Sequence, residues 1–358
     1  MTWIGLHDGE TGLFDRAGLD RAGPDVPARD RGAELSQGSL MIETRAPSLS
    51  RPHALVRFEG RRGLQIALQS LPGGGLTLVV AQGEALQHAT INHSETGRTD
   101  VLRVTFSWGP GLARVAAERT DGLATSLHGM AAMPPFALDD LRAMFQDPGR
   151  LHLTEDVVFL ALSDRIEATG PMPGLHPDTP VATPQGYRPV GRLRRGDTVV
   201  TDGGHVVPVL HRIDRDLPGR GSFAPLRLRA PFFGLRRDIV VAPSQRLLLR
   251  GSEVEYLFGQ EAVLVPASHL SGASAAGPVE APPVMRYSQI LLPDHEAIDA
   301  AGTIAESLFI GRLRRKPALL AASSLADFAE GALPDHGPPR HPVLRAFDAQ
   351  VLADYRAA

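Results

Sequence analysis

Short stretches of strand-forming residues recur through the first third of the chain, and glycine or proline interrupts the sequence after most of them. Within residues 102–108, Leu-Arg-Val-Thr-Phe-Ser-Trp, apolar and polar side chains alternate, which places the four apolar ones on one face of a strand. Short strands separated by turn residues about every 8 to 12 positions are typical of an antiparallel β-sandwich. The strands expected from this pattern are residues 39–43, 54–58, 64–68, 76–81, 89–91, 102–108, 113–117 and 157–162.

The length of 358 residues exceeds what one hydrophobic core usually holds, so two domains are expected. Residues 168–174 carry two prolines and two glycines, which marks a boundary between them. Short strand-like stretches follow it, and helical spacing returns only near the C-terminus. We therefore expect an all-β chain that opens on a loosely ordered lead-in (1–35) with at most a short strand at residues 3–6. A sandwich (36–168) carrying a helix at 138–145, a second β domain (174–316) and a helical tail (317–358) are expected to follow.

Composition excludes several classes of function. The net charge is −3 and the arginines are scattered over both halves, so no nucleic-acid partner is expected. The sequence lacks a run of about 18 apolar residues, and its start has no signal-peptide pattern. We expect a cytoplasmic protein without a membrane span, and export by a route that needs no signal stays open. Because the chain has no cysteine, disulfides, thiolate metal sites and thiol catalysis are excluded.

Residues 174–200 resemble the opening of a Hint (hedgehog/intein) domain of the bacterial type. The stretch Thr179-Pro-Val-Ala-Thr-Pro-Gln-Gly is similar to the family's T-x-I-x-T-P-x-G, and Val190-Gly-Arg-Leu-Arg-Arg-Gly-Asp-Thr-Val matches V-x-x-L-x-x-G-D-x-V. An autoprocessing member opens on a cysteine or serine that attacks the carbonyl just before it. Gly174 holds that place here and offers no nucleophile.

Three further blocks, at residues 237–249, 261–270 and 287–308, carry the same resemblance. It implies that Gln245 replaces the histidine that protonates the scissile amide nitrogen, and that Gln289 replaces a second histidine. A glutamine amide cannot supply a proton near neutral pH. The resemblance also implies that family-like residues are retained at Thr179, His269, His295 and Glu306.

Asn92 is the only asparagine in the chain and lies outside the Hint-like stretch, so splicing that cyclises an asparagine is excluded. These substitutions predict a Hint domain inactive in self-cleavage, acting as a binding or scaffold module and not as an enzyme. The alternative is autocatalytic cleavage near residues 173 and 174 by a variant route. No cofactor or metal is expected, because the spacing of His269, Asp294, His295 and Glu296 matches no compact zinc motif.

The stretch over residues 36–165 resembles the concanavalin/laminin-G type of jelly-roll sandwich. The resemblance implies an unknown protein or glycan ligand at the N-terminal domain, and it leaves a dependence on calcium open. Fold alone does not assign that ligand.

Overall fold

The computed structural model describes residues 3–20, 32–46, 51–92, 100–120, 125–270, 275–328 and 331–357. The chain divides into two compact units, Met1–Gly170 and Pro171–Ala358. Among the described residues, no helix is both long enough and apolar enough to cross a bilayer.

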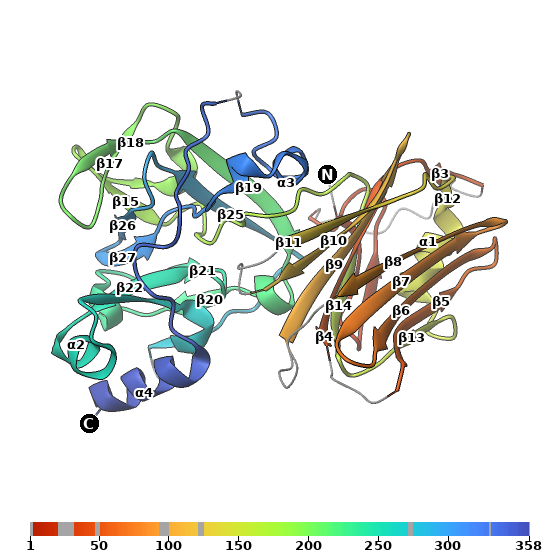
Figure 1. The fold of residues 1–358 in the computed structure, drawn as a ribbon, viewed down its shortest axis with the longest axis horizontal. Coiled ribbons are helices and arrows are strands. Elements are labelled where there is room, and N and C mark those ends of the chain that lie inside the picture. The colour runs from red at the N-terminus through yellow and green to blue at the C-terminus, as the bar shows by residue number, and fades with distance from the viewer. Residues whose placement is uncertain are drawn as a thin grey trace. The chain divides into compact units, whose positions relative to one another are not determined.

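The first unit is a sandwich of two antiparallel sheets (Figure 1). One sheet has the strand order β11-β10-β9-β4-β14-β1-β2, the other has the order β13-β5-β6-β7-β8, and β12 pairs with β3. The strands are β1 (Trp3–His7), β2 (Gly12–Phe14), β3 (Glu34–Leu35), β4 (Gly38–Ala46), β5 (His53–Glu59), β6 (Leu64–Leu71), β7 (Gly75–Gln82), β8 (Ala85–Asn92), β9 (Asp100–Gly109), β10 (Leu112–Arg119), β11 (Thr125–Met130), β12 (Phe136–Ala137), β13 (Leu151–Leu153) and β14 (Val157–Ser163).

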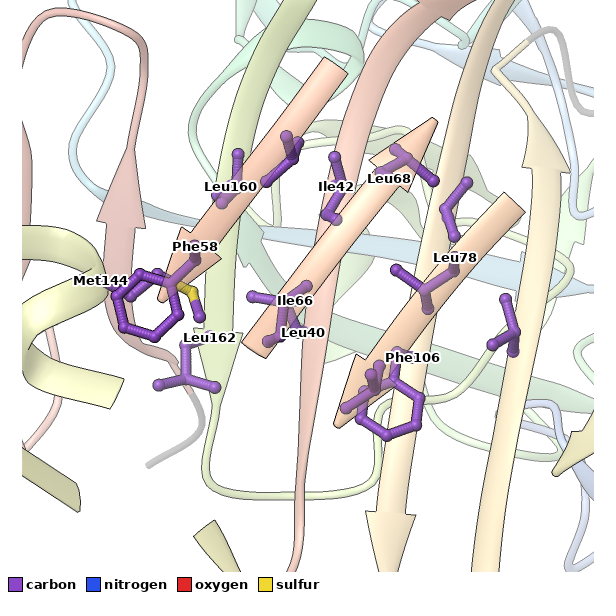
Figure 2. Close-up of a cluster of buried hydrophobic side chains, with 14 of the residues drawn as sticks. Leu40, Ile42, Phe58, Ile66, Leu68, Leu78, Phe106, Met144, Leu160 and Leu162 are labelled. Atoms are coloured by element: carbon purple, nitrogen blue, oxygen red, sulfur yellow. The ribbon is translucent and has the colours of Figure 1, made fainter. Parts of the chain in front are cut away.

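Apolar side chains from both sheets fill the space between them (Figure 2). Leu40 of β4 and Phe106 of β9 come from one sheet, while Phe58 of β5 and Leu68 of β6 come from the other, and each is 2% exposed or less. Burying a side chain of this size stabilises the fold by roughly 1.5–3 kcal/mol. The alternation predicted for residues 102–108 is confirmed, since all four apolar members are buried. The expected sandwich therefore forms.

Helix α1 (Leu138–Gln146) packs onto this sandwich as the sequence predicts. Its buried face includes Leu141 and Met144, which join the core of the sandwich. The carboxylate of Asp140, 2% exposed, accepts hydrogen bonds from the backbone N–H groups of Arg62 and Leu64. That side chain ties the helix to the turn between β5 and β6.

The expectation of a loosely ordered lead-in differs from the structure over residues 3–14. Strand β1 pairs with both β14 and β2, so the two early strands extend the larger sheet. Trp3 and Ile4 are 2% and 1% exposed. The short strand expected at residues 3–6 stands among glycine and aspartate, and pairing with the apolar strand β14 stabilises it. Residues 21–31 of the expected lead-in lie outside the described residues.

The second unit is built from several small antiparallel sheets. The largest has the order β16-β15-β26-β27-β22-β23, and the others are β17-β18, β19-β25 and β21-β20-β24. The strands are β15 (Pro180–Thr183), β16 (Gly186–Pro189), β17 (Thr198–Val200), β18 (Val206–Pro208), β19 (His211–Pro218), β20 (Leu226–Leu228), β21 (Ile239–Val241), β22 (Arg246–Arg250), β23 (Ala262–Pro266), β24 (Ala276–Pro278), β25 (Val284–Leu291), β26 (Ala297–Ala300) and β27 (Thr303–Glu306).

Three short helices complete this unit: α2 (Ser252–Phe258), α3 (Pro317–Ala321) and α4 (Ala346–Ala357). The expected C-terminal helix forms, although it begins at Ala346 and not directly after Pro342. Its Ala349 and Leu352, each 2% exposed, join the core of the second unit. The tail is therefore part of this unit's hydrophobic core.

Candidate functional site

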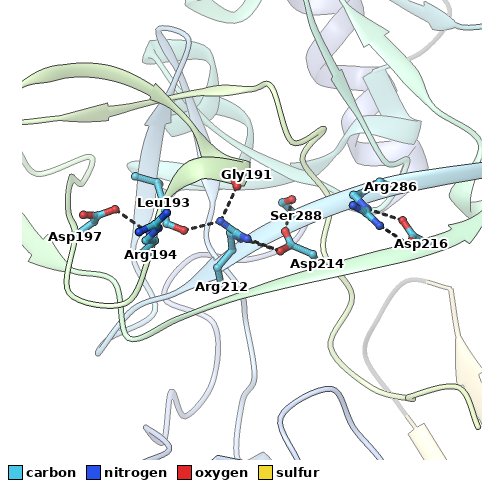
Figure 3. Close-up of polar contacts among 9 residues, drawn as sticks. All are labelled: Gly191, Leu193, Arg194, Asp197, Arg212, Asp214, Asp216, Arg286 and Ser288. Atoms are coloured by element: carbon cyan, nitrogen blue, oxygen red, sulfur yellow. Dashed lines mark hydrogen bonds and ion pairs between the residues drawn. The ribbon is translucent and has the colours of Figure 1, made fainter. Parts of the chain in front are cut away.

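A half-buried arginine shapes the segment that opens the second unit (Figure 3). Arg212 of β19 donates from Nη1 to the carbonyl oxygens of Gly191 and Leu193, at 2.6 and 2.7 Å. Its guanidinium also pairs with Asp214, whose carboxylate accepts a hydrogen bond from Ser288 Oγ on β25. The 3-10 turn Val190–Arg192 of the predicted opening motif is thus held against the long β19-β25 ribbon.

The backbone of residues 174 and 175 is inserted between two strands. Leu175 forms isolated bridges with Val241 of β21 and with Ser288 of β25. The N–H of Ser288 donates to the Leu175 carbonyl at 2.8 Å, and the N–H of Ala242 donates to the Gly174 carbonyl at 2.8 Å. These bonds fix Gly174 in the interior of the unit.

Gly174, Gln245 and Gln289, the three positions that the resemblance points to, lie together at this point. Gln245, which precedes β22, is 4% exposed, and Gln289 of β25 is 3% exposed. Gln289 Nε2 donates to Gln245 Oε1 at 2.9 Å, and both amide nitrogens donate to the backbone carbonyl of Glu306, at 3.0 and 3.1 Å. A Cβ atom added to Gly174 would lie 2.4 Å from Gln245 Oε1. The amide of Gln245 therefore fills the space in which a side chain at position 174 would stand.

This arrangement offers little chemistry of its own. Neither amide titrates near neutral pH, and each finds hydrogen-bonding partners inside the protein, which stabilises a buried polar group. Position 174 has no nucleophilic atom. The side chains of Gln245 and Gln289 form a hydrogen-bonded plug beside Gly174.

The side chains of His295 and Glu306, two residues that the resemblance treats as family-like, lie next to each other beside these amides. His295 Nε2 is 3.0 Å from Glu306 Oε1, and Arg246 Nη1 is 3.2 Å from the same oxygen. The side chains of His295, Arg246 and Glu306 are 7%, 7% and 10% exposed. A buried carboxylate requires such compensation, because removing one partner leaves an unpaired charge.

Arg246 is a site residue that the sequence reasoning missed. A signal for it existed, because Arg246 starts the otherwise apolar run Arg-Leu-Leu-Leu, and a buried arginine in a strand requires a carboxylate partner. The partner, Glu306, is 60 residues away in sequence, so only the pairing of β22 with β27 identifies it.

A small cavity of about 30 Å³ adjoins His295 and Glu306. That volume holds one or two water molecules. Its wall also includes Glu296 and two residues of the tail, Arg340 and His341. The Nδ1 atom of His295 is buried without a hydrogen-bonding partner in the described part of the chain.

The other two family-like residues, Thr179 and His269, lie elsewhere in the unit. Thr179 is 3% exposed and lies in a turn, where its N–H donates to the His176 carbonyl and its carbonyl accepts from the N–H of Val190. His269 lies in a short 3-10 turn, Ala267–Leu270, and interacts with the backbone of Leu344 in the tail. Thr179 therefore belongs to the local turn and His269 faces the tail.

Within the described ranges, no group of three or more His, Cys, Asp and Glu side chains is arranged to hold a metal ion. Asp294 and Glu296 flank His295 in the turn before β26, where the N–H of Glu296 donates to the Asp294 carbonyl.

The fold and the site define an all-β unit that opens on a buried glycine against two glutamines. Residues 173–312 match the family described as Hint domain. The second unit of this chain therefore contains a Hint domain, which follows a sandwich domain. No curated protein matches the chain in sequence.

Solved structures similar to parts of the chain include the gp41-1 intein, at 13% identity and a TM-score of 0.25, covering 38% of this chain and 98% of that one. Another is CBM40 of the Ruminococcus gnavus IT-sialidase, bound to α2,6 sialyllactose. It is 11% identical with a TM-score of 0.25, and the match covers 37% of this chain and 79% of that one. The LG1-3 region of the laminin α2 chain is 8% identical with a TM-score of 0.24, and the match covers 71% of this chain and 38% of that one.

Replacing Gly174 by alanine tests the plug. We expect Gly174→Ala to lower the free energy of unfolding of the second unit by about 1–3 kcal/mol, because the new Cβ overlaps Gln245 Oε1. The loss should shrink when Gln245→Ala is already present. Urea unfolding followed by circular dichroism measures it, while Trp3 and Trp108 fluorescence reports the first unit separately.

Gly277→Ala is the matched control for that substitution. Its Cβ would meet Arg229 Nη2 at 3.4 Å, an ordinary contact, so little change is expected. Equal losses at positions 174 and 277 would show that no plug exists.

Acidification should weaken the second unit more than the first. Burial lowers the pKa of His211, His269, His336 and His341 below the usual 6.5, so the folded unit binds their protons less well than the unfolded chain does. These histidines therefore leave the free energy of unfolding of the second unit unchanged above about pH 6.5, and they lower it as the pH drops below that value. Urea midpoints between pH 7.5 and 5 measure this, and His336→Gln should flatten the dependence whereas the exposed His205→Gln should not. A midpoint that rises on acidification would contradict it.

Proposed function

We propose that the Hint domain of this chain does not process itself and serves as a scaffold. The observation that carries the proposal is the occupation of the space at Gly174 by the amide of Gln245. Cleavage before residue 174 requires a nucleophile close to the preceding carbonyl, and intramolecular attack loses rate steeply when that geometry is displaced.

The loss of the proton donor supports the same conclusion. Gln245 and Gln289 cannot protonate a leaving amide nitrogen, and their hydrogen bonds to the Glu306 carbonyl stabilise the site in a closed arrangement. The buried pair of Arg246 and Glu306 then acts as a support for the fold. The alternative function is self-cleavage by a variant route, in which Thr179 would be the nearest hydroxyl in the opening motif.

Intact mass separates these two functions. We expect purified protein to remain one species of 38.3 kDa after long incubation with thiol or hydroxylamine, because no atom at position 174 attacks the chain. Gly174→Cys alone should also remain intact, since Gln245 blocks the new thiol. The triple variant Gly174→Cys, Gln245→His, Gln289→His supplies a nucleophile together with two side chains that can be protonated, and it is the sensitive comparison. Two wild-type fragments that join between residues 173 and 174 would establish self-processing.

We further propose that the first unit supplies a binding role, with a glycan as the ligand. A groove of about 610 Å³ runs along strands β5 and β13. Arg57 and His152 stand directly opposite each other on these strands, and the side chain of Arg57 is 68% exposed. Arg150 donates to the Glu59 carbonyl and to Asp147, which orders the turn at the end of the groove. Cationic and carboxylate groups side by side suit a ligand rich in hydroxyls, which donate and accept hydrogen bonds.

A glycan array followed by calorimetric titration of the best oligosaccharide tests this role. We expect Arg57→Ala and His152→Ala to weaken binding at least tenfold, because both lose hydrogen bonds to the sugar without disturbing the buried face. His88→Ala on strand β8, an exposed position at the other edge of the same sheet, should bind like the wild type. Failure of the full chain to bind any oligosaccharide would exclude a glycan and leave a protein ligand.

A further inference from the structure

Two helices of the second unit carry exposed aromatic side chains. Helices α2 and α4 pack against each other, and Figure 1 shows them side by side. Tyr256 of α2 and Phe347 of α4, each 77% exposed, are the most exposed large apolar or aromatic side chains in the described part of the chain, and Tyr355 of α4 is 52% exposed. The rings of Tyr256 and Tyr355 lie 6.0 Å apart, centroid to centroid, at a tilt of 31°. We call these three residues the aromatic face.

The spacing along α4 places Phe347 and Tyr355 on the same side of the helix. Eight residues separate them, with Val351 halfway between, and residues four apart are neighbours on a helix surface. Another side of α4 carries Ala349 and Leu352, each 2% exposed, which belong to the core of the unit. The aromatic rings therefore point away from that core, and the described chain leaves them largely open to solvent.

The chain fixes the position of α4. Residues 342–344 lie beside strand β23 in parallel, with Val343 bridged to Leu264. The N–H of Leu264 donates to the Pro342 carbonyl at 2.9 Å, and the N–H of Leu344 donates to the Leu264 carbonyl at 2.8 Å. The aromatic face is therefore formed in advance, so a partner that binds it does not have to order the helix. Because α4 lies beyond the residues that match the Hint family, the matched region alone does not form this face.

The charge of the two helices is negative. Helix α2 has Glu253 and Glu255 and no basic residue, while α4 has Asp348, Asp354 and a single arginine. Four acidic residues against one basic residue give a net charge of −3. Asp354 accepts a hydrogen bond from the neutral amide of Gln350, which leaves its charge in place. This charge repels nucleic acids and acidic lipid headgroups and attracts cationic groups.

We propose that the aromatic face binds a basic segment of a partner protein. A guanidinium or ammonium group within about 6 Å of a ring centre is attracted to the face of the ring, and Tyr256 and Tyr355 offer two neighbouring rings. The carboxylates of both helices pair with further arginine or lysine side chains of the segment. Tyrosine and arginine are among the side chains that contribute most to the affinity of protein interfaces. The inference rests on the scaffold role proposed above and names the kind of partner for it.

A fluorescein-labelled peptide of alternating arginine and glycine tests the proposal. Its binding to the full chain is measured by fluorescence anisotropy at low ionic strength, where attraction between charges is least screened. We expect the double variant Tyr256→Ser, Tyr355→Ser to bind about tenfold more weakly, because it loses two cation–π contacts and keeps every charge. The same peptide with citrulline in place of arginine keeps the shape but not the charge, and it should bind at least tenfold more weakly to the wild type.

Two further variants separate the aromatic rings from other effects. Val206→Ser is the matched control, because it removes an apolar side chain that is 54% exposed on β18, at the opposite end of the second unit from α4 (Figure 1). It should bind the peptide like the wild type. Glu255→Gln together with Asp354→Asn should weaken binding and reduce its dependence on salt, since two attracting charges are gone. Urea unfolding checks that each variant is folded.

Three results would overturn the proposal. They are a wild-type protein that does not bind the arginine peptide, a double tyrosine variant that binds it as tightly as the wild type, and a citrulline peptide that binds equally well. Self-association of the wild type that the double tyrosine variant abolishes would also overturn it, by assigning the aromatic face to a second copy. Intact mass of the same samples reports self-cleavage, so failure of the scaffold role is distinguished from failure of peptide binding.

Discussion

Glu306 is the residue on which the interior of the Hint domain depends. Its backbone carbonyl accepts hydrogen bonds from the amides of Gln245 and Gln289, and its carboxylate is compensated by Arg246 and His295. The Arg246 guanidinium offsets the charge of the buried Glu306 carboxylate, and the two glutamine amides satisfy the Glu306 backbone carbonyl. Glu306 lies at the end of β27, which holds β22 and β26 on either side, so the sheet and the site stabilise each other.

This organisation explains how a domain can keep its framework when its reactive groups differ. The side chains on one side of Glu306 are neutral amides packed against Gly174, and those on the other side form a buried charge network next to a small cavity. The two groups meet at the Glu306 carbonyl and at the Arg246 carbonyl, which also accepts a hydrogen bond from the Gln245 amide.

Strand pattern was sufficient to predict the sandwich, because side chains that alternate along a strand must divide between core and surface. The seven-residue alternation ending at Trp108 and the helix at residues 138–145 both form as expected. The early strand, expected as at most a short element at residues 3–6, is buried in the larger sheet and is followed by a second strand there. Its five residues carry too little information, and its stability comes from a partner about 150 residues away along the chain, a contact that local pattern does not encode.

The sequence by itself determined the chemical content of the Hint domain: glycine at 174, glutamine at 245 and 289, and no cysteine anywhere. It also determined which strands and helices could form, because these depend on local periodicity and turn residues. Only the tertiary structure decided that the three substituted positions touch one another, that Arg246 compensates Glu306, and that the tail covers the β23 edge. Each of these joins segments far apart in sequence, and such contacts are set by how sheets pair and pack as a whole.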